Sequence, residues 1–370
     1  NFGQMPFIFT PPDGYKALQA NNLPEPTIKN GKEHFDTVTY TGSSSAKTVT
    51  GLEFQPDLIW FKSTSHSTSH ALFDSVRGTS PGYLMSDDAG AEETSNGTLT
   101  SFNSDGFTTG VPVLNEYNNG GGRTYVAWCW KAGGAAVSNG NGSITSSVSA
   151  NTDAGFSIVS YTGNLTAGAT VGHGLTSAPE LIMVKARDFS QTWHVKHSSI
   201  GNNTDSLSLD PTAAGINYNA WNNTAPTSSV FSLGPINGTN KSGNDYIAYC
   251  WHSVEGFSKF GSFSGNADAD GTFVYLGFRP SLIIWKSTSS GTDWQMRDIE
   301  RDGNVNPVNL TLYPNVNSSE YSGGSADVDF LSNGFKMRTG DTNVNGGTML
   351  YMAWAEHPFG GENVPPATAR

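Results

Sequence analysis

The chain alternates short apolar runs with polar segments rich in turn-forming residues. Residues 35–40 alternate apolar and polar positions with period two, the pattern of a half-buried strand. Three continuous apolar runs, at 58–61, 181–184 and 282–285, predict central strands covered on both faces. Segments such as 118–122, made of asparagine and glycine, favour turns between strands. No stretch keeps a 3.6-residue apolar period over three turns, so the pattern predicts an all-β protein.

Three segments of the chain share landmarks at nearly constant spacing. In each, a proline precedes an apolar run that ends in a lysine six residues later, and an aromatic ring follows that lysine by eight residues. An acid or a histidine follows the lysine by twelve residues, and two segments add an arginine three residues later. The positions are Pro56, Lys62, His70, Asp74 and Arg77; Pro179, Lys185, Trp193, His197 and Ile200; and Pro280, Lys286, Trp294, Asp298 and Arg301. Such spacing indicates an internal repeat.

The repeated units also end alike, with Tyr-Val-Ala-Trp at 125–128, Tyr-Ile-Ala-Tyr at 246–249 and Tyr-Met-Ala-Trp at 351–354. A unit of about 100 residues with many short strands is typical of a two-sheet sandwich. The sequence therefore predicts three tandem antiparallel β-sandwiches of the jelly-roll or lectin-like kind. We expect them at 35–133, 156–252 and 257–359. A linker or an extra hairpin is expected at 134–155 and a tail at 360–370, while residues 1–34 lie outside the repeat.

The charge content and the lengths of the apolar runs argue against two classes of partner, nucleic acids and membranes. Of the 370 residues only 14% are charged, and the formal net charge is −12. Binding to a nucleic-acid backbone needs clustered Lys and Arg, so we expect no nucleic-acid partner. No apolar run is long enough to span a bilayer, so we expect no membrane insertion.

The two cysteines, Cys129 and Cys250, stand in matching contexts and are predicted to be buried free thiols, each in the core of its own unit. Their number excludes a disulfide-stapled scaffold, and the lack of Cys-x-x-Cys excludes a cysteine zinc site. The spacing of Asn266, Asp268 and Asp270 matches the first half of a calcium loop, but a glycine stands where an EF-hand requires its last glutamate. We therefore expect no metal and no cofactor.

The recurring Lys, Asp and Arg positions form the only repeated charged set. A carboxylate beside a guanidinium can clamp the hydroxyls of a sugar. The same pair can hold a hairpin together, and repetition favours this structural role because repeated units share scaffold residues. The recurring rings His70, Trp193 and Trp294 are likewise expected in the core rather than as stacking platforms.

Aromatic residues in polar loops, outside the repeat landmarks, are the better candidates for ligand binding. They are Tyr117, Tyr218, Trp221 and Tyr321. The chain has no hydrolase nucleophile elbow, Walker loop or dinucleotide fingerprint. The adjacent carboxylates at 87–88 and 92–93 are expected in solvated turns rather than as the acid pair of a glycosidase. We therefore expect no catalytic residues and no enzymatic activity.

The landmarks together resemble a known family. Tyr-Thr-Gly at 40–42, Pro-x-Leu-Ile at 56–59 and Ser-Asp-Gly-Phe at 104–107 resemble the C-terminal repeats of tail-fibre-like proteins of marine tailed bacteriophages. Residues 1–7 and 11–18 resemble the last strand and tail of a SPRY-type lectin-like domain. The resemblance implies a protein on the exterior of a virion, in a tail fibre or on the capsid surface. Other virion proteins would be its partners, and it would form a homo-oligomer, with a trimer as the usual form of fibres.

The first functional hypothesis is a non-enzymatic virion protein that contacts carbohydrate on the host surface. The alternative is a purely structural spacer or decoration module. The second alternative is a glycoside hydrolase that degrades capsule. Three sandwiches in one chain could also be self-sufficient as a monomer.

Overall fold

The computed structural model describes residues 25–79, 82–94, 99–112, 117–200, 205–212, 216–322 and 327–358. These residues form strands and turns almost throughout, so the all-β prediction is confirmed. The helical elements are the 3-10 helix η2 (Gly31–Glu33) and two single turns, α1 (Asn237–Asn240) and α2 (Thr342–Asn345). Residues 1–24, which carry the resemblance to a SPRY-type strand, and the tail at 360–370 lie outside the described residues.

Three main antiparallel sheets share one strand order. The first sheet is β1-β7-β3-β4, and the third is β18-β24-β20-β21. The second contains the same arrangement as β10-β17-β12-β13, which β14 and β15 extend at one edge and β9 and β8 at the other. The strands that correspond across the sheets are β1 (Phe35–Thr41), β10 (Phe156–Thr162) and β18 (Ser258–Asn266); β7 (Thr124–Trp130), β17 (Asp245–Trp251) and β24 (Gly346–Pro358); β3 (Leu58–Ser63), β12 (Leu181–Ala186) and β20 (Phe278–Ser287); and β4 (Ala71–Asp74), β13 (His194–His197) and β21 (Gln295–Asp298).

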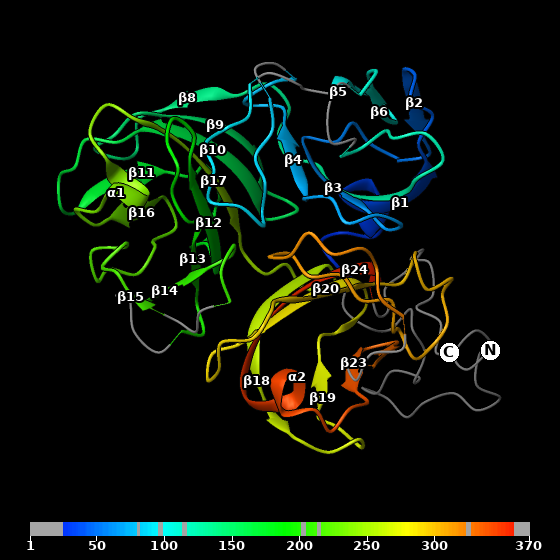
Figure 1. Ribbon diagram of the computed structural model, residues 1–370. Helices are drawn as coiled ribbons and strands as arrows, with labels where there is room; N and C mark the ends of the chain where they lie inside the picture. The colour runs from blue at the N-terminus through cyan, green and yellow to red at the C-terminus, as the bar shows by residue number, and fades with distance from the viewer. Residues whose placement is uncertain are drawn as a thin grey trace, which may run out of the picture.

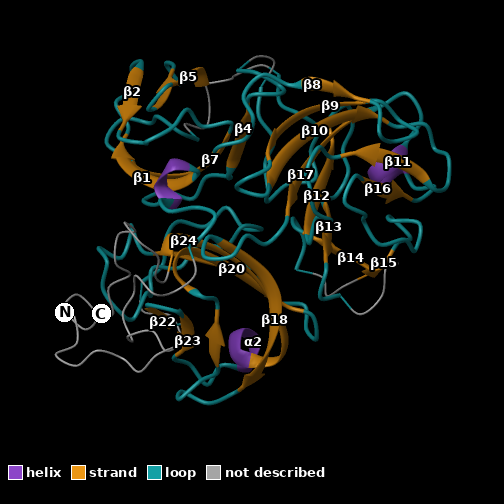
Figure 2. Cartoon of the chain, turned by 180° about the vertical axis from the view of Figure 1, so that it is seen from behind, coloured by secondary structure: helices purple, strands orange, loops and turns teal. Residues whose placement is uncertain are grey.

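A smaller sheet covers one face of each main sheet and completes a sandwich. The three small sheets are β2 (Lys47–Thr50), β6 (Gly106–Thr109) and β5 (Leu99–Asn103); β11 (Ala169–Gly172) and β16 (Val230–Leu233); and β19 (Phe273–Tyr275), β23 (Gly334–Met337) and β22 (Val328–Leu331). The edge strands of the second main sheet are β8 (Val137–Asn139), β9 (Ser146–Asn151), β14 (Asp205–Ser208) and β15 (Ile216–Asn217). Figures 1 and 2 show the three sandwiches arranged around a common centre.

The continuous apolar runs arise because each main sheet is buried on both faces. On β3, Ile59 and Phe61 enter the core of the first sandwich, whereas Leu58 and Trp60 point to the other face, into a central core shared by all three sheets. Strand β12 divides in the same way, with Ile182 and Val184 in the core of the second sandwich and Leu181 and Met183 in the central core. Every residue of both strands is buried, as the sequence predicted.

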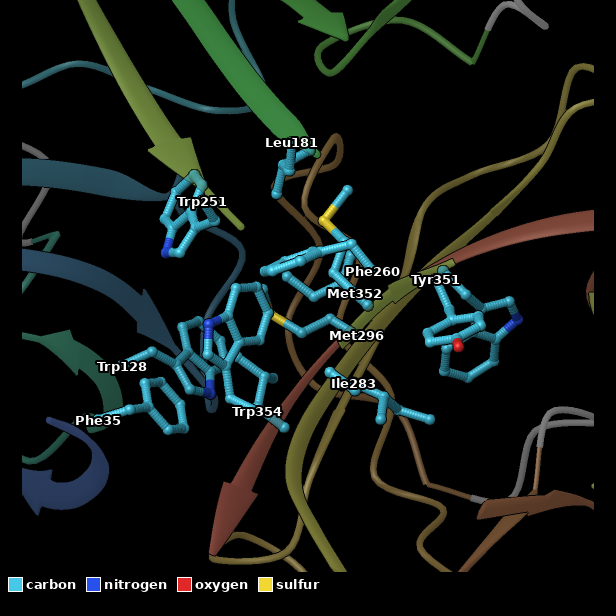
Figure 3. Packing of buried hydrophobic residues seen from close by; sticks show 14 of the residues in the cluster. Phe35, Trp128, Leu181, Trp251, Phe260, Ile283, Met296, Tyr351, Met352 and Trp354 are labelled. Atoms are coloured by element: carbon cyan, nitrogen blue, oxygen red, sulfur yellow. The ribbon is translucent and has the colours of Figure 1, made fainter. Parts of the chain in front are cut away.

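Three tryptophans from the middle strands meet in the central core. The ring centroids of Trp130 and Trp251 lie 6.2 Å apart, those of Trp130 and Trp354 5.4 Å and those of Trp251 and Trp354 6.0 Å, each pair edge to face. This geometry is favoured by aromatic quadrupoles. Figure 3 shows Trp251 and Trp354 among residues contributed by all three main sheets. The first and second sandwiches therefore keep cores of their own, and the outer faces of the three main sheets together form one further, shared core.

Two expectations change. The segment at 134–155 is not a linker, because β8 and β9 form the extra hairpin that pairs with β10 and enlarges the second sheet. The alignment of the repeated units that placed Trp354 opposite Trp128 is wrong by two residues. Leu282 pairs with Trp354 just as Leu58 pairs with Trp130, so Trp354 corresponds to Trp130. The boundaries of the units themselves stay predictions.

Candidate functional site

The three recurring lysines connect neighbouring sandwiches. Each is buried, and its ammonium group donates to backbone carbonyls of a segment from the next sandwich in a ring. We call residues 82–94, 205–212 and 310–322 the crossing segments. The Nζ–O distances are 2.6 Å from Lys185 to Gly90, 3.1 Å from Lys286 to Thr212 and 3.2 Å from Lys62 to Asn317. Burial lowers the pKa of each lysine to about 8.

The recurring aromatic residues also contact the crossing segments of the neighbouring sandwiches, in the same order as the lysines. Trp193 Nε1 donates to Met85 O at 2.7 Å, and Trp294 Nε1 donates to Ser208 O at 3.0 Å. His70 Nδ1 accepts from Trp60 Nε1, so its Nε2 carries the proton and donates to Tyr313 O at 3.0 Å. All three rings are buried, and the expectation that they belong to the core is met. The first crossing segment holds the second sandwich, the second holds the third, and the third holds the first.

Both recurring Asp–Arg pairs are buried scaffold. Arg77 Nε donates to Asp74 Oδ2 and Arg301 Nε to Asp298 Oδ2, each at 2.5 Å and each within one tight turn. The same acids accept from the neighbouring sandwich. Tyr249 Oη donates to Asp74 at 2.8 Å, and Trp128 Nε1 donates to Asp298 at 3.1 Å. These positions favour the structural role over a sugar clamp, because both oxygens of each carboxylate already have partners within the protein.

His197 takes the place of the aspartate in the second sandwich. Its Nδ1 accepts from Ser199 N at 3.1 Å, as the aspartates accept turn amides, and its Nε2 donates to Tyr351 O of the third sheet at 3.2 Å. Burial lowers its pKa to about 4, so the ring is neutral at pH 7. A neutral ring needs no guanidinium, and Ile200 stands where the other units have arginine. Met352, which corresponds to Tyr249, has no hydrogen to donate to a carboxylate.

A cleft of about 370 Å³ opens where the third crossing segment meets the first sheet. Hydroxyl-bearing residues of the first sheet form one wall, and Arg301 with two glutamates forms the other. The lining residues are Thr39, Tyr40, Thr41, Thr64, Thr124, Tyr125, Glu300, Arg301 and Glu320. Arg301 Nη1 donates to Glu320 Oε2 at 2.7 Å. The volume lies in the range of small-molecule sites, and the wall offers both donors and acceptors.

Of the four aromatic candidates, only two present a largely exposed ring. Tyr218 is 44% exposed and Tyr321 54%. Tyr117 is half-buried, and its ring centroid lies 5.1 Å from that of Tyr83. Trp221 is 1% exposed within the core of the second sandwich, so the prediction that it binds a ligand is wrong. Its ring folds back from the loop onto the apolar interior, which removes more apolar surface from water than a loop position would.

The residues that sequence reasoning missed are those of the cleft. Thr64, Thr124, Glu300 and Glu320 come from opposite ends of the chain and belong to no recognisable motif. One signal was present: Arg77 has Glu92 fifteen residues on, and Arg301 has Glu320 nineteen residues on. The unequal spacing hid the correspondence that the two ion pairs reveal.

Other candidate chemistry is accounted for within the described residues. No group of three His, Cys, Asp or Glu that could hold a metal occurs among them. Asp270 is paired with Lys336 at 2.5 Å rather than joined to further carboxylates. Cys129 and Cys250 are buried free thiols in different sandwich cores, as predicted, and burial raises the pKa of both. No helix in the described part of the chain is long and apolar enough to cross a membrane.

Comparison with curated proteins gives no match to the chain, and comparison with solved structures gives none either. One family model does match, a domain of unknown function, over residues 30–358. This span includes all three main sheets and the cleft. The chain therefore belongs to the DUF7483 family, a domain of unknown function.

Proposed function

We propose that this chain is a non-enzymatic protein of a bacteriophage virion, in a tail fibre or on another exposed surface, that contacts carbohydrate of the host. The observation that carries the proposal is the cleft between the first sheet and the third crossing segment. Its threonine hydroxyls and the Arg301–Glu320 pair supply the mixture of donors and acceptors that sugar hydroxyls need. The virion assignment rests on the sequence resemblance alone.

The ring of sandwiches supports this role because it makes the cleft rigid. Glu320 N donates to Thr64 O at 2.8 Å, and Arg301 is fixed by Asp298. Both walls are thus joined through backbone and buried side chains before any ligand arrives. A preorganised site avoids the entropic cost of ordering loops on binding. Weak single sites would act together if several copies are displayed on one particle, as in the expected trimer.

The test is binding of the recombinant chain to candidate host cells before and after periodate oxidation of their surface sugars. We expect binding that periodate abolishes. The variant Thr41→Trp places a large ring at the exposed rim of the cleft and should lose binding, whereas Thr50→Trp, on an exposed position of β2 away from the cleft, should keep it. Binding that survives both periodate and Thr41→Trp would contradict the proposal.

A purely structural module is the second candidate, and one observation favours it. The recurring lysines, rings and aspartates make contacts between sandwiches of one chain. A folded chain that binds no host cell would support this alternative. The hydrolase is tested separately on polysaccharide from the same cells, because release of reducing ends would reveal cleavage that involves Glu300 or Glu320.

A further inference from the structure

Two places in the ring have the same backbone but different side chains. Glu92 N donates to Arg187 O at 2.8 Å, and Glu320 N donates to Thr64 O at the same distance. Arg187 N and Thr64 N in turn donate to Asp245 O and Thr124 O, each at 2.9 Å. Thr64 therefore occupies in the first sheet the position that Arg187 occupies in the second.

The glutamate at the first place binds two arginines, whereas the glutamate at the second place binds one. Arg77 and Arg187 bind the two oxygens of Glu92, with Nη1–Oε1 and Nε–Oε2 distances both 2.7 Å, and the Glu92 side chain is 5% exposed. Glu320 receives Arg301 on Oε2 in the same way, but its Oε1 has no donor among the described residues. Its side chain is 20% exposed. Thr64 is too short to reach it and bonds instead to the hydroxyl of Thr124, at 2.5 Å.

The cleft thus lies beside Thr64, at the backbone position where the second sheet carries the arginine that binds Glu92. The cleft keeps the acceptor, Glu320. The second sheet has a cation, Arg187, at the position where the first sheet has Thr64. Glu300, an exposed residue, adds a second carboxylate to the lining. A charge-assisted hydrogen bond from a cation to Glu320 would restore the arrangement seen at Glu92.

We infer that the cleft takes an amino sugar, with the ammonium group at Glu320 and the ring hydroxyls along the threonines of the first sheet. This inference rests on the proposed function, since it names the class of carbohydrate. The hydroxyl-lined wall favours a sugar over an arginine side chain of a protein, because the threonines offer donors and acceptors that the three-carbon stem of arginine cannot use.

The test is titration calorimetry of the full chain at low ionic strength with glucosamine, N-acetylglucosamine, glucose and free arginine. We expect glucosamine to bind about tenfold more tightly than its N-acetylated form or glucose, since the charge-assisted bond is lost in both. Glu320→Gln should remove that preference. Added salt should weaken glucosamine binding, because the pair lies near the surface.

Two opposite substitutions test the correspondence between Thr64 and Arg187. Thr64→Arg supplies the missing side chain and should abolish glucosamine binding. Arg187→Thr opens the corresponding space at Glu92 and should raise the stoichiometry from one to two. Arg187→Thr is expected to gain a binding site, so its result stays informative even if Thr64→Arg does not fold. Thermal unfolding of each variant beside the wild-type chain separates loss of ligand from loss of structure.

The outcomes distinguish the two levels of the proposal. Equal affinity for glucosamine and glucose would overturn the amino-sugar inference while leaving carbohydrate binding intact. Binding of arginine without binding of any sugar would overturn it in favour of a protein partner. Absence of binding to all four probes, with a folded chain that also fails to bind host cells, would overturn both.

Discussion

Trp128 Nε1 donates to Asp298 Oδ2 at 3.1 Å, although the two residues lie 170 positions apart. The bond joins strand β7 of the first sheet to the last residue of β21 in the third. Tyr249 and Asp74 form its counterpart between the second sheet and the first. His197 Nε2 and Tyr351 O supply the third link, between the second sheet and the third. The ring of three sandwiches is therefore closed by buried polar bonds as well as by the shared apolar core.

Loss of one such bond should weaken the whole chain. Tyr249→Phe removes only the hydroxyl that donates to Asp74, a carboxylate with no exposed side-chain surface. A bond to a buried charged group contributes about 1.5–3 kcal/mol, so we expect the free energy of unfolding to fall by about that much. Urea denaturation measures it, and Tyr321→Phe, at an exposed ring, is the control with no expected change. Equal stability of both variants would contradict the assigned role of the bond.

The shared core predicts that the sandwiches unfold together. Trp251→Ala removes one ring of the tryptophan triad, and truncation of a buried tryptophan costs about 3–5 kcal/mol. Because Trp251 contacts both Trp130 and Trp354, the loss should lower the unfolding temperature of all three sandwiches as one transition. Differential scanning calorimetry checks this. Two separated transitions, of which only one moves, would show that the sandwiches are independent.

The local pattern of apolar and polar residues was enough to predict the strands, but it did not predict the contacts that join the three sandwiches into a ring. Alternation and apolar runs follow from whether a strand is covered on one face or two, and this is a property of neighbouring residues. The lysine contacts could not be anticipated, because their acceptors, such as the carbonyl oxygens of Gly90 and Thr212, are groups that nearly every residue has. The sequence therefore indicated recurring lysines without indicating where they reach.

The candidate site shows the same limit. Tyr218 and Trp221 share one polar loop, yet one ring is exposed and the other lies in the core, and nothing in the local composition separates them. The cleft is lined by the short side chain of Thr64, at the position where Arg187 reaches Glu92 in the second sheet. Such a difference becomes visible only when the backbone shows that the two positions correspond.

The substitutions around His197 should behave as one coupled set. His197→Asp alone places a carboxylate beside Ile200 and faces it toward the carbonyl of Tyr351, so we expect a loss of about 3–5 kcal/mol. Adding Ile200→Arg should recover part of this loss, since it rebuilds the pair seen at Asp74 and Arg77. A double-mutant cycle by urea denaturation measures the coupling. Simple additivity of the two changes would refute it.

The neutral state of His197 predicts an acid-sensitive contribution to stability. Its pKa is about 4 in the folded chain and about 6.5 when unfolded, so between these values the unfolded chain binds more protons. The contribution is complete above pH 6.5 and is lost as the pH falls toward 4. Relative to His197→Asn, which keeps an acceptor and a donor in the same place, the wild-type chain should lose roughly 2–3 kcal/mol between pH 7 and pH 4.5. Urea denaturation of both chains at the two pH values measures the difference, and His194, which titrates in both, cancels. Parallel pH profiles for the two chains would mean that His197 is not held in the neutral form.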